Sequence, residues 1–184
     1  MSHSDLSGTL LRFVLEHSPG GPSAAVSERL DRVLCGAVLV DLLAGSFIGL
    51  DASKQLRHRP DHHATPTSPV LARSLEVLGD APSPGAVQAW LQHLERGLPE
   101  LRALVHRSSA TRSRATRMPS TLKRLKIAVQ PRATLPPHMA TLLSLIDAVG
   151  MLEPILEPDE LDRARGVIAW QLDRQSIVRV VLEA

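Results

Sequence analysis

Seven basic side chains lie between residues 107 and 126, and no acidic side chain lies among them. The acid-free stretch is longer still, because no Asp or Glu occurs between Glu100 and Asp147. Nine of the 21 Lys and Arg residues fall in this window, whereas the other 12 accompany all 19 acidic residues. Such a local excess of cations suits a polyanion, which could be an anionic membrane, a nucleic acid or an acidic protein. The candidate anion-binding residues are Arg102, Arg107, Arg112, Arg114, Arg117, Lys123, Arg124 and Lys126.

A second group of polar residues could bind a metal. His58, Asp61, His62 and His63 lie together in a proline-marked loop. Zinc sites usually need a further pair of ligands at a characteristic spacing, and the remaining histidines are isolated along the chain. We therefore interpret this loop as solvent-exposed, and we expect neither a metal nor a cofactor.

Two more candidates lie inside the apolar stretch "VLCGAVLVDLLA" at 33–44. Burial raises the pKa of a thiol, so Cys35 is expected to pack in the core rather than act as a nucleophile. An unpaired buried carboxylate is energetically expensive, so we expect a backbone amide or a neighbouring arginine to bind Asp41. The chain has no phosphate-binding glycine loop, HExxH or GxSxG motif. The sequence therefore predicts a protein that is not an enzyme.

The elements that position these residues are predicted to be mostly helices separated by prolines. A helix over 5–17 contains the apolar run Leu10, Leu11, Phe13, Val14 and Leu15, and a helix over 27–45 has Ser27 as its cap and Gly45 at its end. Because the second helix is apolar on nearly every face, it belongs at the centre of the core. Further helices are predicted to begin at Ser68-Pro69, Ser83-Pro84 and Pro99-Glu100, and two more lie within "PPHMATLLSLIDAVGMLEPIL" and "EPDELDRARGVIAWQL". A last helix is expected to contain Ile177, Val180 and Val181.

Two segments are not simple helices. "SFIGLD" and "KQLRHR" flank the turn residues Asp51, Ala52 and Ser53, which predicts a β-hairpin. "STLKRLKIAV" at 120–129 fits a helix with Leu122, Leu125 and Val129 on one face, and it fits a strand equally well. As a helix, this segment could lie in a membrane interface on its apolar face.

Length and composition suggest how the chain is organised. We expect one compact, mainly α-helical domain over residues 1–184, with one small β-hairpin and a basic segment at residues 107–136. No apolar run approaches the roughly 20 residues that span a bilayer. The N-terminus does not have the pattern of a secretory signal, and a single cysteine favours a reducing compartment. These features predict a cytoplasmic protein.

Several stretches in succession resemble the Golgi-phosphoprotein-3-like family, which has many bacterial relatives. "LCGAVLVDLLAGSFIGLD" at 34–51 is similar to the family's central helix and first hairpin strand. The stretches that resemble its later helices are "ATPTSPVLARSLEVL", "SPGAVQAWLQHLERG", "MATLLSLIDAVGMLEPIL" and "RARGVIAW". The resemblance implies a helical, non-enzymatic adaptor that docks on membranes. Its eukaryotic members bind phosphatidylinositol 4-phosphate and retain Golgi enzymes.

The chain departs from the family in two regions. The family's headgroup pocket uses one tryptophan and three arginines, and the resemblance places these near Val26, at Cys35, at Arg102 and near Val105. Only Arg102 keeps the family's residue. The central segment is also shortened, because the basic segment stands where the family has a hydrophobic membrane-inserting hairpin.

Together these observations predict a peripheral membrane adaptor that binds anionic lipid headgroups through the cations of residues 102–132. The expected partners are anionic membrane lipid and a membrane-associated or biosynthetic client protein. Two alternatives stay open. The basic segment could dock on an acidic protein, or it could bind nucleic acid without sequence preference. The central helix has no exposed face for a major groove, and the four Phe and Trp residues lie among apolar neighbours, so nucleic acid is the less expected partner.

Overall fold

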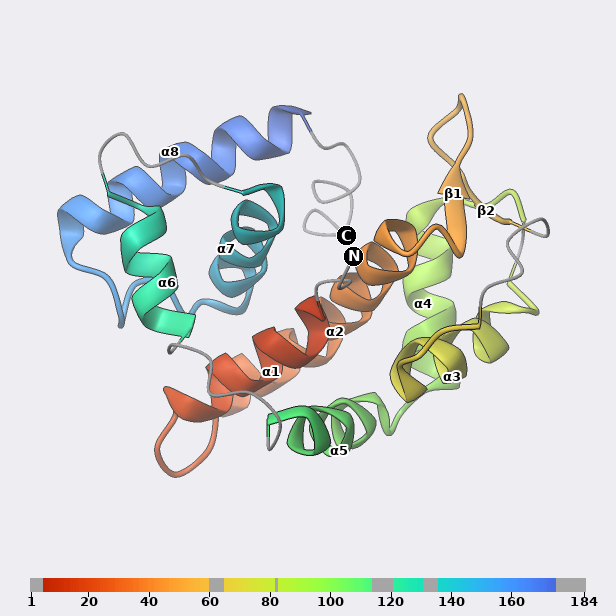
Figure 1. The fold of residues 1–184 in the computed structure, drawn as a ribbon, viewed down its shortest axis with the longest axis horizontal. Helices are drawn as coiled ribbons and strands as arrows, with labels where there is room; N and C mark the ends of the chain where they lie inside the picture. The colour runs from red at the N-terminus through yellow and green to blue at the C-terminus, as the bar shows by residue number, and fades with distance from the viewer. Residues whose placement is uncertain (1–4, 60–64, 82, 114–120, 131–135, 175–184) are drawn as a thin grey trace.

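The computed structural model describes five stretches of the chain, residues 5–59, 65–81, 83–113, 121–130 and 136–174, with the backbone alone at 111–113 and 171–174. Within these stretches the chain forms eight helices and one two-stranded antiparallel sheet. The predicted fold class, mainly α with one small β-hairpin, is confirmed. The elements are α1 (Leu6–Glu16), α2 (Ala24–Ala44), β1 (Ile48–Leu50), β2 (Leu56–His58), α3 (Pro69–Leu78), α4 (Val87–Gly97), α5 (Leu101–Ser113), α6 (Thr121–Ala128), α7 (Pro137–Val149) and α8 (Pro158–Arg174) (Figure 1).

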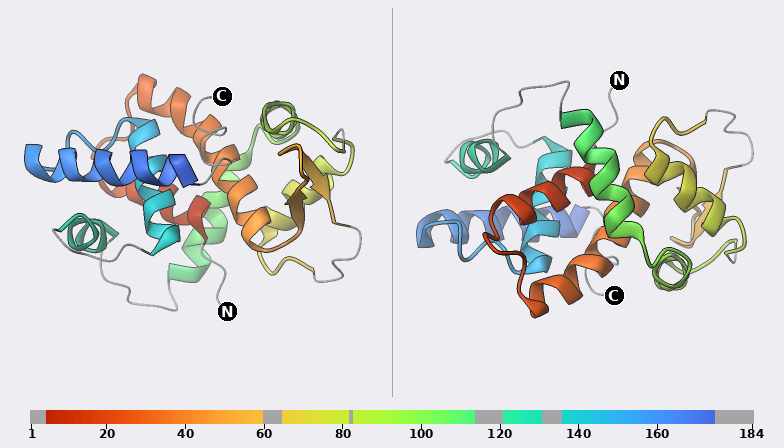
Figure 2. Two further views of the ribbon diagram at one scale, coloured as in Figure 1. Left: turned by 90° about the horizontal axis from the view of Figure 1, so that it is seen from above. Right: turned by 90° about the horizontal axis from the view of Figure 1, so that it is seen from below.

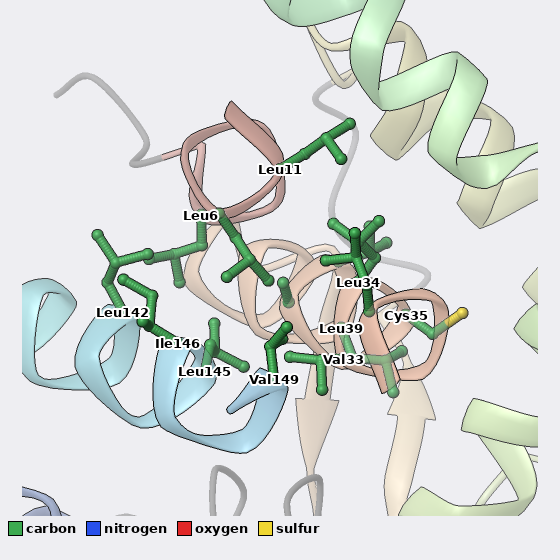
Figure 3. Packing of buried hydrophobic residues seen from close by; sticks show 14 of the residues in the cluster. Leu6, Leu11, Val33, Leu34, Cys35, Leu39, Leu142, Leu145, Ile146 and Val149 are labelled. Carbon is green, nitrogen blue, oxygen red and sulfur yellow. The ribbon is translucent and has the colours of Figure 1, made fainter. Parts of the chain in front are cut away.

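The central helix of the fold is α2, because its apolar side chains point to every side. It packs against α1, α3, α4, α5 and α7, as expected for a helix without a polar face. Figure 3 shows α7 side chains, among them Leu142, Leu145 and Val149, directed toward α1 and α2. Buried apolar side chains from all eight described helices belong to one continuous cluster.

The start of α2 differs from the prediction. The hydroxyl of Ser23 accepts the backbone N–H of Val26 at 3.3 Å, so Ser23 rather than Ser27 caps the helix. Ser27 already lies in the first turn, because its own N–H donates to the carbonyl of Ser23 at 2.8 Å. As a result, Glu28 and Asp31 lie beyond the first turn. The predicted end of the helix at Gly45 is confirmed.

The predicted β-hairpin is present. Ile48 pairs with His58 and Leu50 pairs with Leu56 across two antiparallel strands. The carboxylate of Asp51 accepts the backbone N–H groups of Ser53 at 2.8 Å and Gln55 at 2.9 Å, which closes the turn.

The hairpin also explains why the predicted helix start at Ser83-Pro84 is wrong. Leu56 and Gly85 exchange two backbone hydrogen bonds of 2.8 and 2.9 Å, so the chain after Pro84 extends along β2. The hydroxyl of Ser83 accepts the backbone N–H of His58 at 3.1 Å instead of capping a helix. The helix α4 therefore begins only at Val87.

Most of the described part of the basic segment is helical. The C-terminal half of α5 carries its first residues, and α6 resolves the choice between helix and strand at 120–129 in favour of a helix. Both helices contact α1, and in the views of Figures 1 and 2 α1 lies between them. Among the described residues, the cations of the acid-free stretch are therefore divided between two helices that both contact α1.

Candidate functional site

Arg102 lies on the first turn of α5 and bridges it to α2. Its Nε donates to a carboxylate oxygen of Asp31 at 2.9 Å, and its terminal nitrogen Nη2 donates to the backbone carbonyl of Ser27 at 2.6 Å. The side chain is about one-third exposed, at 34%. Although the sequence predicts it as a lipid ligand, in this structure its guanidinium holds the start of α5 against the first half of α2.

The other predicted cations of α5 extend toward its C-terminus. Arg107 is exposed on the helix. Arg112 belongs to α5, but its side chain lies outside the described residues, as do Arg114 and Arg117 entirely. Of the predicted binding residues of α5, Arg107 is therefore the exposed cation that the structure describes.

The apolar face of α6 is turned toward the protein. Leu125 and Val129 are 1% and 2% exposed, and Leu122 is half-buried against the same core. The expectation that this face lies in a membrane interface is wrong, because it packs against α1 and α7 instead. The outward face contains Lys123, Ile127 and Gln130, at the i, i+4, i+7 spacing of a helical stripe.

Each of the three predicted α6 cations has a different setting. Lys123 is exposed, and Arg124 is half-buried. The ammonium of Lys126 lies 3.6 Å from a carboxylate oxygen of Glu160 on α8. A second link between these helices runs from Nε of Arg163 to the backbone carbonyl of Val129 at 2.9 Å. One of the three cations therefore forms an ion pair between α6 and α8.

A groove runs along the surface between the adjacent helices α1 and α5. It comprises two cavities of about 280 and 630 Å³, which share Leu11, Leu15 and His106 in their walls and therefore adjoin. Leu15 is 40% exposed, an unusual position for a large apolar side chain in this fold. Figure 3 shows Leu11 pointing away from the α7 side chains that fill the other side of α1.

Asp41 binds the N-terminal end of α1 from inside the core. Its carboxylate accepts the backbone N–H groups of Leu6 at 3.0 Å and Ser7 at 3.2 Å, together with the Ser7 hydroxyl at 3.2 Å. The prediction that a backbone amide binds this carboxylate is confirmed. Burial raises the pKa of Asp41 to about 7, against the lowering effect of these hydrogen bonds.

Cys35 has the predicted structural role. The side chain is 3% exposed, and burial, together with the charges of Glu95 and Asp31, raises the pKa of its thiol to about 12. Figure 3 shows its sulfur directed away from α7. A thiol with this pKa stays protonated at neutral pH and is a poor nucleophile.

The described histidines give no metal site. Among the residues that the structure describes, no group of three His, Cys, Asp or Glu side chains could hold a metal ion. Asp61, His62 and His63 of the predicted loop lie outside the described residues. The ring of His58 packs against Trp90 with centroids 4.8 Å apart, which is a core contact.

One expectation about aromatic residues is wrong. Phe13 and Trp90 are fully buried, but Trp170 on α8 is 56% exposed. It lies on the side of α8 opposite Ala164 and Ile168, which face the core. The sequence places Trp170 next to apolar neighbours, but the helical period turns them to the other side.

The comparisons with known proteins now decide the family. The sequence model of Golgi phosphoprotein 3 (GPP34) matches residues 10–183. The chain belongs to the Golgi phosphoprotein 3 family. No curated protein was found to match it. The family match covers the groove, the acid-free stretch and the core of the Golgi phosphoprotein 3 fold in this chain.

The resemblance to the family assigns its headgroup pocket to four positions that the structure describes. Cys35 and Val105 are buried, at 3% and 1% exposure, and neither carries a charge at neutral pH. Val26 is half-buried near the start of α2. The remaining arginine, Arg102, contacts Asp31. These four positions do not form a cluster of cations in this member of the Golgi phosphoprotein 3 family.

Sequence reasoning missed the groove. The run "LLRFVLE" at 10–16 contains more large apolar residues than one face of a helix can bury, which was a usable signal. Leu15 is the residue left outside. The ion pairs of Arg102 and Lys126 had no such signal, because their partners lie 71 and 34 residues away in sequence.

Proposed function

We propose that this protein is a non-enzymatic adaptor that associates peripherally with anionic membrane lipid. Family membership supports an adaptor role of the Golgi phosphoprotein kind. None of the helices in the described part of the chain is both long and apolar enough to cross a bilayer. Association through the surface of the protein is therefore the form of membrane contact that we propose.

The observation that carries the proposal is the exposure of cations on two helices of one acid-free stretch. Arg107 on α5 and Lys123 on α6 are both exposed, and no acidic residue occurs between Glu100 and Asp147. A cation near an anionic leaflet contributes about 1 kcal/mol. Several such cations acting together give useful affinity, and further arginines of the same stretch add to the local charge.

An exposed apolar residue of α6, Ile127, also supports membrane contact through this surface. Ile127 is 52% exposed and lies one helical turn from Lys123. Its side chain is suited to partial insertion between headgroups, where it adds apolar burial to the electrostatic term. This contribution is limited, because the larger apolar face of α6 is already buried in the protein.

The proposed contact is loosely selective for the headgroup. A phosphoinositide site needs several cations that converge on phosphate groups. The corresponding positions here hold a protonated thiol, a buried valine and an arginine bound to Asp31. We therefore propose recognition of negative surface charge rather than of one phosphoinositide.

Flotation with lipid vesicles tests the proposal. The full chain is mixed with neutral phosphatidylcholine vesicles, or with vesicles that also contain phosphatidylglycerol, and centrifuged through a density step. We expect flotation only with anionic vesicles, and release at high salt because the screening length falls from about 10 Å at 0.1 M to about 3 Å at 1 M. Equal flotation with both vesicle types, or none with either, contradicts the proposal.

The same preparation distinguishes the two alternatives. Binding of one acidic protein in stoichiometric amount, with no vesicle binding, would identify the basic segment as a protein-docking surface. A mobility shift with nucleic acid that weakens steeply with salt, again without vesicle binding, would indicate a nucleic-acid binder.

A further inference from the structure

Asp41 has an exceptional position among the charged side chains of this protein. Of the Asp, Glu, Lys, Arg and His side chains in the described part of the chain, it is the one that is buried, at 3% exposure. It lies near the C-terminal end of α2, and its carboxylate reaches the N-terminal end of α1. The three hydrogen bonds that the structure gives it come from two backbone N–H groups and a hydroxyl, which are all neutral donors.

A second carboxylate meets the same end of α1. Asp5 is the N-cap of this helix, and its Oδ1 accepts the backbone N–H of Gly8 at 2.9 Å. The hydroxyl oxygen of Ser7 lies 3.2 Å from Oδ1 of Asp5 and 3.2 Å from Oδ2 of Asp41. A hydroxyl carries one hydrogen, so it can donate to only one of two ionised carboxylates. Both contacts are favourable only if one of the two carboxyl groups is protonated.

The proton belongs on Asp41, because this carboxyl is the more deeply enclosed of the two. Asp5 is half-buried, whereas Asp41 is almost fully buried. Burial raises the pKa of Asp41 to about 7, and the negative charge of Asp5 acts in the same direction. A protonated Asp41 donates its O–H to the Ser7 oxygen, and the Ser7 hydroxyl donates in turn to Asp5. This order gives every oxygen of the chain a compatible partner.

The other charged groups around α1 and α2 lie outside the core. On α7 the ionisable side chains are His138, which is exposed, and Asp147, which is half-buried. On α5, His106 and Arg107 are exposed. The described charged side chains elsewhere on α1 and α2, and those of α3, α4 and α6, are not buried either. Asp5 is therefore the charged group that shares a hydrogen-bond partner with Asp41.

We propose that Asp5, Ser7 and Asp41 form a proton-dependent latch on the first turn of α1. With the proton in place, the hydrogen-bonded chain of the three side chains holds this turn against α2. When Asp41 releases the proton to solvent, two carboxylates compete for one hydroxyl hydrogen and the first turns of α1 loosen. Because α5 and α6 both contact α1, the latch also affects how firmly these two basic helices are supported. It goes beyond the proposed membrane contact and does not depend on it.

Carboxyl-carbon NMR of the full chain tests the shared proton. We expect the Asp41 signal to titrate with a midpoint near pH 7, and the Asp5 signal to show a smaller step at the same pH. Ser7→Ala removes the hydroxyl that joins the two groups, so the step at Asp5 should disappear while Asp41 still titrates near neutrality. An Asp41 signal that titrates below pH 5, or a step at Asp5 that persists in Ser7→Ala, would overturn the latch.

Hydrogen exchange tests whether α1 loosens. After correction for the intrinsic exchange rate, the amides of Leu10 and Leu11 should be roughly 20-fold more protected at pH 5.5 than at pH 7.5, as the pKa difference between closed and open states requires. At pH 7.5 they should also be less protected than the amides of Leu39 and Leu42 in α2, because the opening is local. Equal protection of the two helices at pH 7.5 would show that α1 does not open by itself, and would overturn the latch.

Two variants assign the pH effect to its residue. Asp41→Asn cannot ionise, so its α1 protection should be the same at both pH values. Asp147→Asn is the matched control, because burial also raises the pKa of this half-buried carboxyl, which lies on α7. The control should keep the pH dependence of the wild type. A dependence that persists in Asp41→Asn, or is lost in Asp147→Asn, would assign the proton to another group and overturn the proposal.

Discussion

The two basic helices α5 and α6 come from one acid-free stretch, yet they are held in the fold by different means. The N-terminal part of α5 packs deeply, with Leu101 and Val105 almost fully buried, and the helix contacts α1, α2 and α3. The shorter α6 packs on α1 and α7 and is linked to α8 by an ion pair and a hydrogen bond. Similar sequence composition therefore produces one wall of the core and one peripheral helix.

The comparison shows that basic residues of one charge-rich stretch can have different settings in the fold. Each helix has one cation in an ion pair with another helix, Arg102 on α5 and Lys126 on α6. Each also exposes one, Arg107 and Lys123. We propose that Arg107 and Lys123 face the membrane, and the structure shows Arg102 and Lys126 in ion pairs within the fold.

The largest expected effect concerns the buried face of α6. Leu125→Ala should lower the free energy of unfolding by about 2–4 kcal/mol, because it leaves a cavity where α6 meets the core. Ile127→Ala, two residues away on the exposed face, should change it by less than about 0.5 kcal/mol. Urea denaturation measures both. Equal, small losses would mean that α6 is not docked as described.

The next effect is a pH dependence of the free energy of unfolding. It originates at Asp41, the buried carboxyl group that binds the start of α1. Because its pKa is about 7 in the folded protein and near 3.8 when unfolded, the native state binds one more proton between these values. The free energy of unfolding should therefore rise as the pH falls from about 7 toward 5, by at most about 1.4 kcal/mol per pH unit, and stay level above pH 7.

Asp41→Asn isolates this contribution, since the amide mimics the protonated carboxyl. The difference in unfolding free energy between wild type and variant should change over the same pH interval. A difference that is constant from pH 5 to pH 8 would show that Asp41 is ionised throughout.

A smaller effect separates the two arginines of α5. Arg102→Met removes the links to Asp31 and Ser27 and should cost about 1 kcal/mol of stability, the scale of a partly exposed charged hydrogen bond. Arg107→Met should stay within about 0.5 kcal/mol. Thermal unfolding of the two variants decides the point, and a larger loss for Arg107→Met would reverse the assignment.

The smallest effect is expected for the ion pair that links α6 to α8. A double-mutant cycle with Lys126→Ala and Glu160→Ala should give a coupling of about 0.5 kcal/mol or less, because the lysine side chain is 41% exposed. A coupling above about 2 kcal/mol would assign this contact a much larger share in docking α6 than we infer.

Much of this fold could be predicted from local pattern alone. The central helix follows from its all-round apolar sequence, the hairpin from the turn residues after Leu50, and the role of Asp41 from the cost of burying a carboxylate. The errors came from tertiary contacts. Gly85 pairs with Leu56 and delays α4, and the core takes the apolar face of α6 that the sequence equally allowed for lipid.

The site was harder to predict for the same reason. Charge density in the sequence located the basic helices α5 and α6, but the ion pairs of Arg102 and Lys126 depend on carboxylates far away along the chain. The groove depends on the packing of α1 against α5, two elements about 90 residues apart, and no local motif encodes it.

The central claim is that exposed cations, rather than net charge, bind the membrane. Two double variants that remove the same charge test it most directly: Arg107→Gln with Lys123→Gln, and Arg102→Gln with Lys126→Gln. Partition onto phosphatidylglycerol vesicles is measured at one salt concentration for both. We predict that the first variant binds about 30-fold more weakly, from about 1 kcal/mol for each cation, while the second binds nearly like the wild type. Equal losses in the two variants would contradict the account.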